Sequence, residues 1–126
     1  MRNKKEYELC KSVANYLRLQ YPKVMFHFDL AGLNLSKAQA GMMKAIQGSR
    51  GWPDLFIAGC NEKYKGLFIE LNIESPFKHD GTLKKDSHLE EQQRTLQQLW
   101  DLGYGASFGV GFRQCKEIID NYMNLK

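Results

Sequence analysis

Two short apolar segments, joined by a polar loop, constrain the fold of this chain most. The first spans 54–58 (Asp-Leu-Phe-Ile-Ala) and the second spans 66–73 (Gly-Leu-Phe-Ile-Glu-Leu-Asn-Ile). Their length and their β-branched and aromatic content are typical of buried strands. The loop between them has the polar content of a hairpin connection, so we predict that the two strands are antiparallel neighbours in one sheet.

Each of these two strands carries a carboxylate. Asp54 begins the first strand, and Glu70 lies inside the second, between Ile69 and Leu71. Burial of a carboxylate is costly unless another group compensates it, and antiparallel pairing lets these two acids approach each other. Their oxygen atoms suit a hard cation such as Mg²⁺ or Mn²⁺, which could activate water. The alternative is that Asp54 caps the preceding turn and Glu70 pairs with a lysine.

The rest of the chain supplies helices and two further strands. Apolar residues at offsets of three and four, with Ser36 as an N-cap and Gly103 as a C-terminal stop, mark the helices. Helices are predicted over 4–20, 37–46, 88–102 and 113–122. Strands are predicted over 24–28 and 104–110. This order predicts an α/β fold in which a small mixed sheet is flanked by helices.

Length and composition limit the function classes. The 126 residues support a single domain, 1–126, and the net charge of +4 permits a nucleic-acid partner without demanding one. No apolar run approaches the ~20 residues of a membrane span, and the charged N-terminus does not resemble a signal peptide. The three cysteines lack metal-binding or disulfide spacing, so we expect reduced thiols and a cytoplasmic protein.

The segments 51–55 (Gly-Trp-Pro-Asp-Leu) and 66–72 (Gly-Leu-Phe-Ile-Glu-Leu-Asn) resemble the active-site signature of the PD-(D/E)XK nucleases. The likeness is greatest to the stand-alone VRR-NUC domain of phages and bacteria, and it extends over nearly the whole chain. It implies a restriction-endonuclease-like core and a DNA endonuclease that depends on Mg²⁺ or Mn²⁺. It also implies a homodimer that cleaves branched DNA such as Holliday junctions, in a bacterial cell or a phage-infected host.

The resemblance assigns roles to particular residues. Asp54 and Glu70 match the metal-binding acids, and the backbone carbonyl of Leu71 would be a further ligand. Glu6 matches an N-terminal acid that many members add to the site. Glu8 is the less favoured choice because it points away from the apolar face of the first helix, and either acid could equally be solvated.

Two further positions carry the resemblance and its main departure. Gln92 matches a helix glutamine that faces the site, with Gln93 as the alternative and an ordinary exposed amide as the other reading. The lysine of the signature is replaced by Asn72, which cannot supply positive charge, so we expect slowed chemistry with metal and DNA binding retained. The chain could be a variant that has drifted to binding or a form inactivated by one substitution. Another cation could also move in, namely Lys65, Lys78 or Arg50.

Several basic and polar residues are candidates for contact with the DNA backbone, although each could equally be solvated. These are Lys37, Lys44, Ser49, Arg50, Lys65 and Lys78. A dimer face could include Leu33, Leu35, Met42 and Met43, which core packing explains equally well. His79 and His88 lack metal-ligand spacing and are expected to face solvent. The competing functions are a catalytically silent DNA-structure-binding module and a small protein-interaction domain with structural acids.

Overall fold

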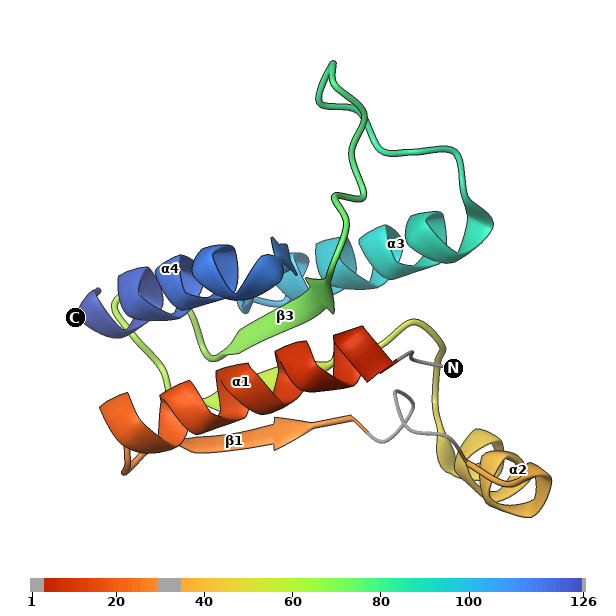
Figure 1. The fold of residues 1–126 in the computed structure, drawn as a ribbon, viewed down its shortest axis with the longest axis horizontal. Coiled ribbons are helices and arrows are strands. Elements are labelled where there is room, and N and C mark those ends of the chain that lie inside the picture. Colours follow the sequence, from red (N-terminus) through yellow and green to blue (C-terminus); the bar gives the residue numbers. More distant parts are fainter. Residues whose placement is uncertain (1–3, 30–34, 126) are drawn as a thin grey trace.

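The computed structural model describes residues 4–29 and 35–125. Within these ranges, four helices and four strands follow one another in the predicted order (Figure 1). The helices are α1 (Lys4–Gln20), α2 (Lys37–Ile46), α3 (Ser87–Asp101) and α4 (Gly111–Asn124). The strands are β1 (Met25–Phe28), β2 (Leu55–Ala58), β3 (Leu67–Asn72) and β4 (Gly105–Val110). None of the described helices is long and apolar enough to cross a membrane.

The four strands form one mixed sheet in the order β1-β2-β3-β4. β2 pairs antiparallel with both β1 and β3, which confirms the predicted hairpin, whereas β4 runs parallel to β3. Leu55 of β2 lies opposite Ile69 of β3. In an antiparallel pair this register places the preceding residue, Asp54, opposite Glu70 and on the same side of the sheet.

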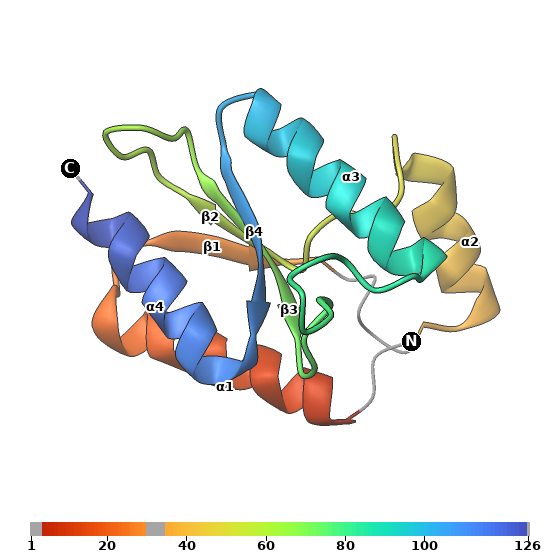
Figure 2. The same ribbon diagram turned by 90° about the horizontal axis from the view of Figure 1, so that it is seen from above.

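Helices cover the sheet on both faces (Figure 2). α1 and α4 pack against each other and against β3, and their buried residues join the inward-facing residues of β2 and β3 in one apolar core. Leu17, Ile57, Ile69 and Ile119 are fully buried in this core. Because side chains alternate along a strand, Glu70 points away from Ile69, toward the face that α3 covers.

The helix ends differ slightly from those predicted. α3 begins at Ser87, one residue early, because Asp86 accepts the backbone N–H groups of His88 and Leu89. α4 begins at Gly111 instead of Arg113 and continues to Asn124. The predicted cap at Ser36 is confirmed, and Gly103 has a φ of 102°, as a left-handed helix stop requires.

α2 stands apart from the main body (Figure 1). None of its residues is buried, and Met42 and Ile46 are 70% and 80% exposed. Core packing therefore does not account for Met42, whereas Met43 and Leu35 are half-buried. Leu33 lies outside the described residues. The apolar side chains of Met42 and Ile46 are therefore largely exposed to solvent, and few of the described residues pack against them.

The connection 74–86 forms an arm that projects from the sheet between β3 and α3 (Figure 1). Phe77 and Leu83 form an isolated antiparallel bridge, and the backbone N–H of Lys78 donates to the carbonyl of Thr82 at 2.7 Å. The Phe77 ring meets Phe108 of β4 edge-on, with centroids 5.8 Å apart. The arm thus starts and ends beside Asn72 and His88, which both line the pocket described below.

Candidate active site

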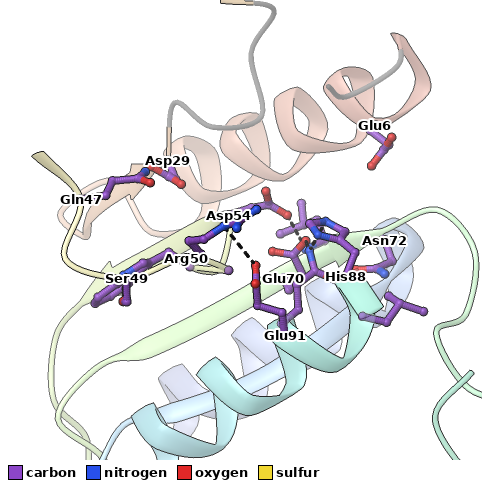
Figure 3. A pocket seen from close by; sticks show the side chains of 15 residues that line it. Glu6, Asp29, Gln47, Ser49, Arg50, Asp54, Glu70, Asn72, His88 and Glu91 are labelled. Atoms are coloured by element: carbon purple, nitrogen blue, oxygen red, sulfur yellow. Dashed lines mark hydrogen bonds and ion pairs between the residues drawn. The ribbon is translucent and has the colours of Figure 1, made fainter. Parts of the chain in front are cut away.

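A pocket opens where the carboxyl ends of β1 and β3 meet the start of β2 and the first turns of α1 and α3 (Figure 3). Its lining is strongly acidic. The lining carboxylates are Glu6, Asp29, Asp54, Glu70 and Glu91. Among the residues that line it, Arg50 is the single guanidinium, and His88 contributes an imidazole. The pocket therefore concentrates negative charge at one edge of the sheet.

Asp54 and Glu70 lie at the buried floor of this pocket, as their antiparallel strands predict. Their exposed fractions are 8% and 5%. Asp54 Oδ2 accepts the backbone N–H of Leu71 at 2.9 Å, which ties the start of β2 to the end of β3. This bond holds the Asp54 carboxylate next to the strand position whose carbonyl the resemblance assigns as a ligand.

Gln92 reaches the same floor from α3. Its Nε2 donates to Glu70 Oε2 at 2.6 Å and lies 3.3 Å from His88 Nε2, one helical turn earlier. Gln92 is 7% exposed, whereas Gln93 is exposed and faces a separate groove between α3 and β4. Of the two glutamines, the structure therefore brings Gln92 to the acids.

Asn72 lines the pocket, but its amide turns back onto the backbone. In the amide orientation that satisfies both of its polar atoms, Nδ2 donates to the carbonyl oxygens of Glu70 and Leu71, each at 3.1 Å. The side chain thus occupies the position where the signature has lysine, yet it engages its own strand. One of the two lone pairs of the Leu71 oxygen is used in this way.

Two acids from other elements join the pocket. Glu6, in the first turn of α1, is half-buried and lines it, whereas Glu8 is exposed and does not. Asp29 follows β1, and its backbone N–H donates to the Asp54 carbonyl at 2.7 Å. Asp29 was not predicted, although a lone acid directly after the strand 24–28 was an available signal.

The turn before β2 is packed against α3. Thr95 Oγ1 donates to the Arg50 carbonyl at 3.1 Å, and a Cβ on Gly51 would lie only 3.1 Å from side-chain atoms of Glu91 and Thr95. The φ of Gly51, 77°, also favours glycine. This packing brings Arg50 Nε to 4.0 Å from Glu91 Oε1, with an Arg50 side chain that is 83% exposed.

The other predicted DNA contacts lie at different distances from this pocket. Ser49 and Arg50 line it. Lys37 and Lys44 lie on α2, Lys78 lies in the arm, and Lys65 precedes β3 beside Gly103, at the strand end remote from Asn72. These four lysines are described and do not line the pocket, so their contact with DNA stays a prediction.

His88 has a position that its predicted exposure did not reveal. It is exposed, as predicted, but it lines the acidic pocket and contacts Gln92. Sequence spacing missed it because its relation to the acids arises from the docking of α3 on the sheet. Glu91 was missed for the same reason.

The donor set fits a hard divalent cation with an incomplete protein shell. Among the described residues, no group of three His, Cys, Asp or Glu side chains could hold a metal ion. Asp54 and Glu70, with the Leu71 carbonyl, instead offer two carboxylates and one carbonyl. Mg²⁺ commonly binds through one or two carboxylates and keeps several waters, so this set suits it.

The charge of Asp54 also affects the buried thiol of Cys115 in α4. Burial, and after it the charges of Cys10 and Asp54, raise the pKa of this thiol to about 12.

Comparisons with known proteins define the fold class. No protein-family model and no curated protein sequence matches the chain. A solved structure of a VRR_NUC domain protein matches with a TM-score of 0.67, over 99% of this chain and 93% of that chain. The two sequences are 22% identical, so the likeness establishes the fold. The predicted α/β, restriction-endonuclease-like core is therefore confirmed.

Proposed function

We propose that this chain is a metal-dependent DNA endonuclease whose active site is the acidic pocket. One observation carries the proposal: Asp54 and Glu70 are buried opposite each other at the end of an antiparallel strand pair, in a pocket with three further carboxylates. Gathering so much like charge is unfavourable unless a cation shares the site. The fold shared with a VRR_NUC domain protein gives independent support to nuclease chemistry.

Asp54, Glu70 and the Leu71 carbonyl would hold Mg²⁺ or Mn²⁺. When bound, such an ion supplies an activated water and offsets the charge that develops on a phosphodiester. The chain keeps the ligands in place: Gln92 holds the Glu70 carboxylate, and the Leu71 N–H holds that of Asp54. Glu6, from α1, would complete the acidic wall on the side away from α3.

Asn72 is expected to slow the chemical step. An amide that bonds to the Glu70 and Leu71 carbonyls supplies neither a positive charge nor a donor aimed at phosphate. Loss of one donor that stabilises a transition state costs ~10²–10³ in rate. The proposed enzyme is therefore impaired in this form.

The proposed substrate is branched DNA such as a Holliday junction, cut by a homodimer. The sequence resemblance supports this substrate, and the exposed Met42 and Ile46 of α2 supply an apolar surface for a second copy. A two-fold dimer would offer two pockets to two strands. Replacing both residues by aspartate should leave a folded monomer in analytical ultracentrifugation. A dimer that persists in this variant contradicts the assignment of α2.

A catalytically silent module that binds DNA structures is the second candidate. Asn72 favours it, because the acids that would bind metal are present while the lysine of the signature is absent. In that case the pocket would contribute to metal-assisted binding and not to hydrolysis.

Cleavage assays on the Asn72 chain and its Asn72→Lys variant, run side by side, test the proposal. The substrates are nicked, forked and four-way DNA, each with Mg²⁺ or Mn²⁺. We expect Asn72→Lys to cleave at least one substrate ~10²–10³ times faster than the Asn72 chain. If Asn72→Lys is inert on every substrate, the endonuclease is contradicted, and metal-dependent DNA binding by the same protein then supports the silent module.

A further inference from the structure

We propose that His88 binds the scissile phosphate and supplies a hydrogen-bond donor there, although not the positive charge that the lysine of the signature would bring; this inference rests on the proposed nuclease function. His88 is the second residue of α3 and lies one turn before Gln92. It lines the same pocket as Asp54, Glu70 and Asn72 (Figure 3). Its imidazole is exposed, so a phosphate group can reach it.

The position of His88 is defined by contacts on both its backbone and its ring. Its backbone N–H donates to Asp86 Oδ1 at 2.8 Å, within the cap that begins α3. Its ring Nε2 lies 3.3 Å from Gln92 Nε2. Because Gln92 is itself held by Glu70, the imidazole is linked through one amide to a carboxylate on the pocket floor.

The contact with Gln92 also determines which ring nitrogen donates. An amide nitrogen can only donate, and one proton of Gln92 Nε2 is directed to Glu70 Oε2 at 2.6 Å. The other proton is then available to His88 Nε2, which must accept it. In a neutral imidazole this arrangement places the ring proton on Nδ1. The Nδ1–H group is therefore the ring donor that remains for a ligand.

Two other side-chain donors of the pocket lining are directed to protein groups: Trp52 Nε1 donates to Ser49 Oγ at 2.8 Å, and the Gln92 amide is directed to Glu70 and His88. Arg50 is 83% exposed, with its Nε 4.0 Å from Glu91 Oε1, so it is a second donor that can approach a phosphate, from the turn before β2. Gln47 belongs to the turn before β2 and lies near Asp29 in Figure 3. A phosphodiester that enters this acidic pocket needs donors as well as a cation, and the Nδ1–H of His88 meets that need from α3.

In the proposed step, a water oxygen attacks phosphorus and forms a new P–O bond. The P–O bond to the leaving strand breaks, and the leaving oxygen takes up a proton while the attacking water loses one to solvent. His88 exchanges no proton. Its Nδ1–H donates to a non-bridging phosphate oxygen, on which negative charge increases in the transition state.

A double-mutant cycle between positions 88 and 72 tests the inference. His88→Ala and His88→Asn are compared in the Asn72 chain and in the Asn72→Lys variant, on the substrate that Asn72→Lys cleaves. In the Asn72 chain we expect His88→Ala to lower kcat ~10²–10³-fold. His88→Asn should keep most of the activity, because its Nδ2 lies close to the position of the imidazole Nδ1. In Asn72→Lys the loss should be less than tenfold, because lysine supplies a donor.

His27→Ala is the matched control, since His27 is exposed on β1 and does not line the pocket. It should leave cleavage unchanged, and thermal melting should show all variants folded. A purely structural role for His88 would lower activity equally in both backgrounds without rescue by asparagine, which would overturn the inference. An active Asn72→Lys beside an inert Asn72 chain would overturn it too. If every variant is inert, including Asn72→Lys, the proposed nuclease function itself fails.

Discussion

Asp120 and the acids of the pocket show two ways in which this chain accommodates carboxylates. Asp120 of α4 accepts the hydroxyl groups of Tyr16 and Tyr21 at 2.5 and 2.7 Å and pairs with Lys116 at 2.9 Å. The two tyrosines join α4 to α1 and its following turn, whereas Lys116 lies one turn earlier on α4 itself. The Asp120 cluster (Asp120, Tyr16, Tyr21 and Lys116) therefore satisfies its charge with groups of the protein alone.

The pKa values show this balance in the Asp120 cluster. Burial works to raise the pKa of Asp120, but the hydrogen bonds from Tyr16 and Tyr21, with the bond and charge of Lys116, outweigh it and lower that pKa. Burial and the bond to Asp120 raise the pKa values of both tyrosines. The cluster is thus stable as one carboxylate, two neutral phenols and one ammonium.

The acidic pocket differs in how many carboxylates it gathers. Five carboxylates line it with a single guanidinium among the lining residues, and Arg50 is largely exposed. Two of the carboxylates, Asp54 and Glu70, are more than nine-tenths buried. The comparison teaches that a half-buried, hydrogen-bonded carboxylate does not by itself mark a functional site, whereas an accumulation of like charge is typical of a ligand site.

The largest expected effect follows from removing one charge at the pocket. Asp54→Asn keeps an oxygen that can accept the Leu71 N–H but weakens cation binding. In the Asn72→Lys background we expect cleavage to fall at least ~10³-fold, since a bound metal lowers the barrier by several kcal/mol. Single-turnover cleavage measures this. Activity within tenfold of the parent would show that Asp54 is not a metal ligand.

Removing the charge of the Asp120 cluster should affect stability instead. Asp120→Ala leaves two tyrosine hydroxyls and an ammonium without their shared acceptor, which costs about 1–3 kcal/mol of unfolding free energy. Urea unfolding measures this loss. Asp101→Ala, at an exposed carboxylate of α3, is the control and should change stability by less than about 0.5 kcal/mol. If Asp120→Ala and Asp101→Ala lose the same unfolding free energy, the Asp120 cluster has no special role in stability.

Removing one charge from the acidic pocket should change the unfolding free energy less than Asp120→Ala does, and in the opposite direction. Without a divalent cation, Asp54→Asn removes one of five neighbouring negative charges, so the unfolding free energy should stay the same or rise by up to about 1 kcal/mol. With Mg²⁺ present, the parent chain should gain stability and Asp54→Asn should not. Urea unfolding of both proteins, measured once in EDTA and once with Mg²⁺, separates the effect of charge repulsion from the effect of metal binding. A variant that is less stable in EDTA would make Asp54 a structural acid.

The smallest expected effect is the pH dependence of the Asp120 cluster. Because the folded-state pKa of Asp120 is lowered, its contribution to stability is present above about pH 4 and is lost as pH falls through the folded value. The raised tyrosine pKa values act in the other direction: their contribution is present below about pH 10 and is lost as pH rises through the higher folded values. Asp120→Ala should therefore have a flatter stability profile between pH 7 and 3. Parallel profiles for parent and variant would contradict this.

Much of the fold was predictable because it depends on local periodicity. The apolar strands around Asp54 and Glu70 fixed a hairpin, and with it the approach of the two acids. The partner of β1 was not predictable, since sheet order depends on how distant segments pack; the acid after that strand, Asp29, was visible in the sequence, but its position beside Asp54 was not. Lys65 was named as a cation that could replace the lysine of the signature. It precedes β3 whereas Asn72 ends that strand, so the two residues lie at opposite ends of β3.

The helical part of the site was predictable only in part. Gln92 followed from the resemblance, whereas His88 depends on where α3 begins and how it docks against β3. The exposure of α2 was equally hidden, because an amphipathic pattern does not distinguish a core face from a face that another chain covers.

Calorimetric titration of Mn²⁺ into the Asn72 chain tests the central claim most directly. Asp54→Asn and Asp120→Asn make the same chemical change in the acidic pocket and in the Asp120 cluster. We expect saturable binding to the parent and to Asp120→Asn, and a loss of at least tenfold in affinity for Asp54→Asn. Absent binding in the parent, or equal binding in all three proteins, would contradict a metal site at Asp54 and Glu70.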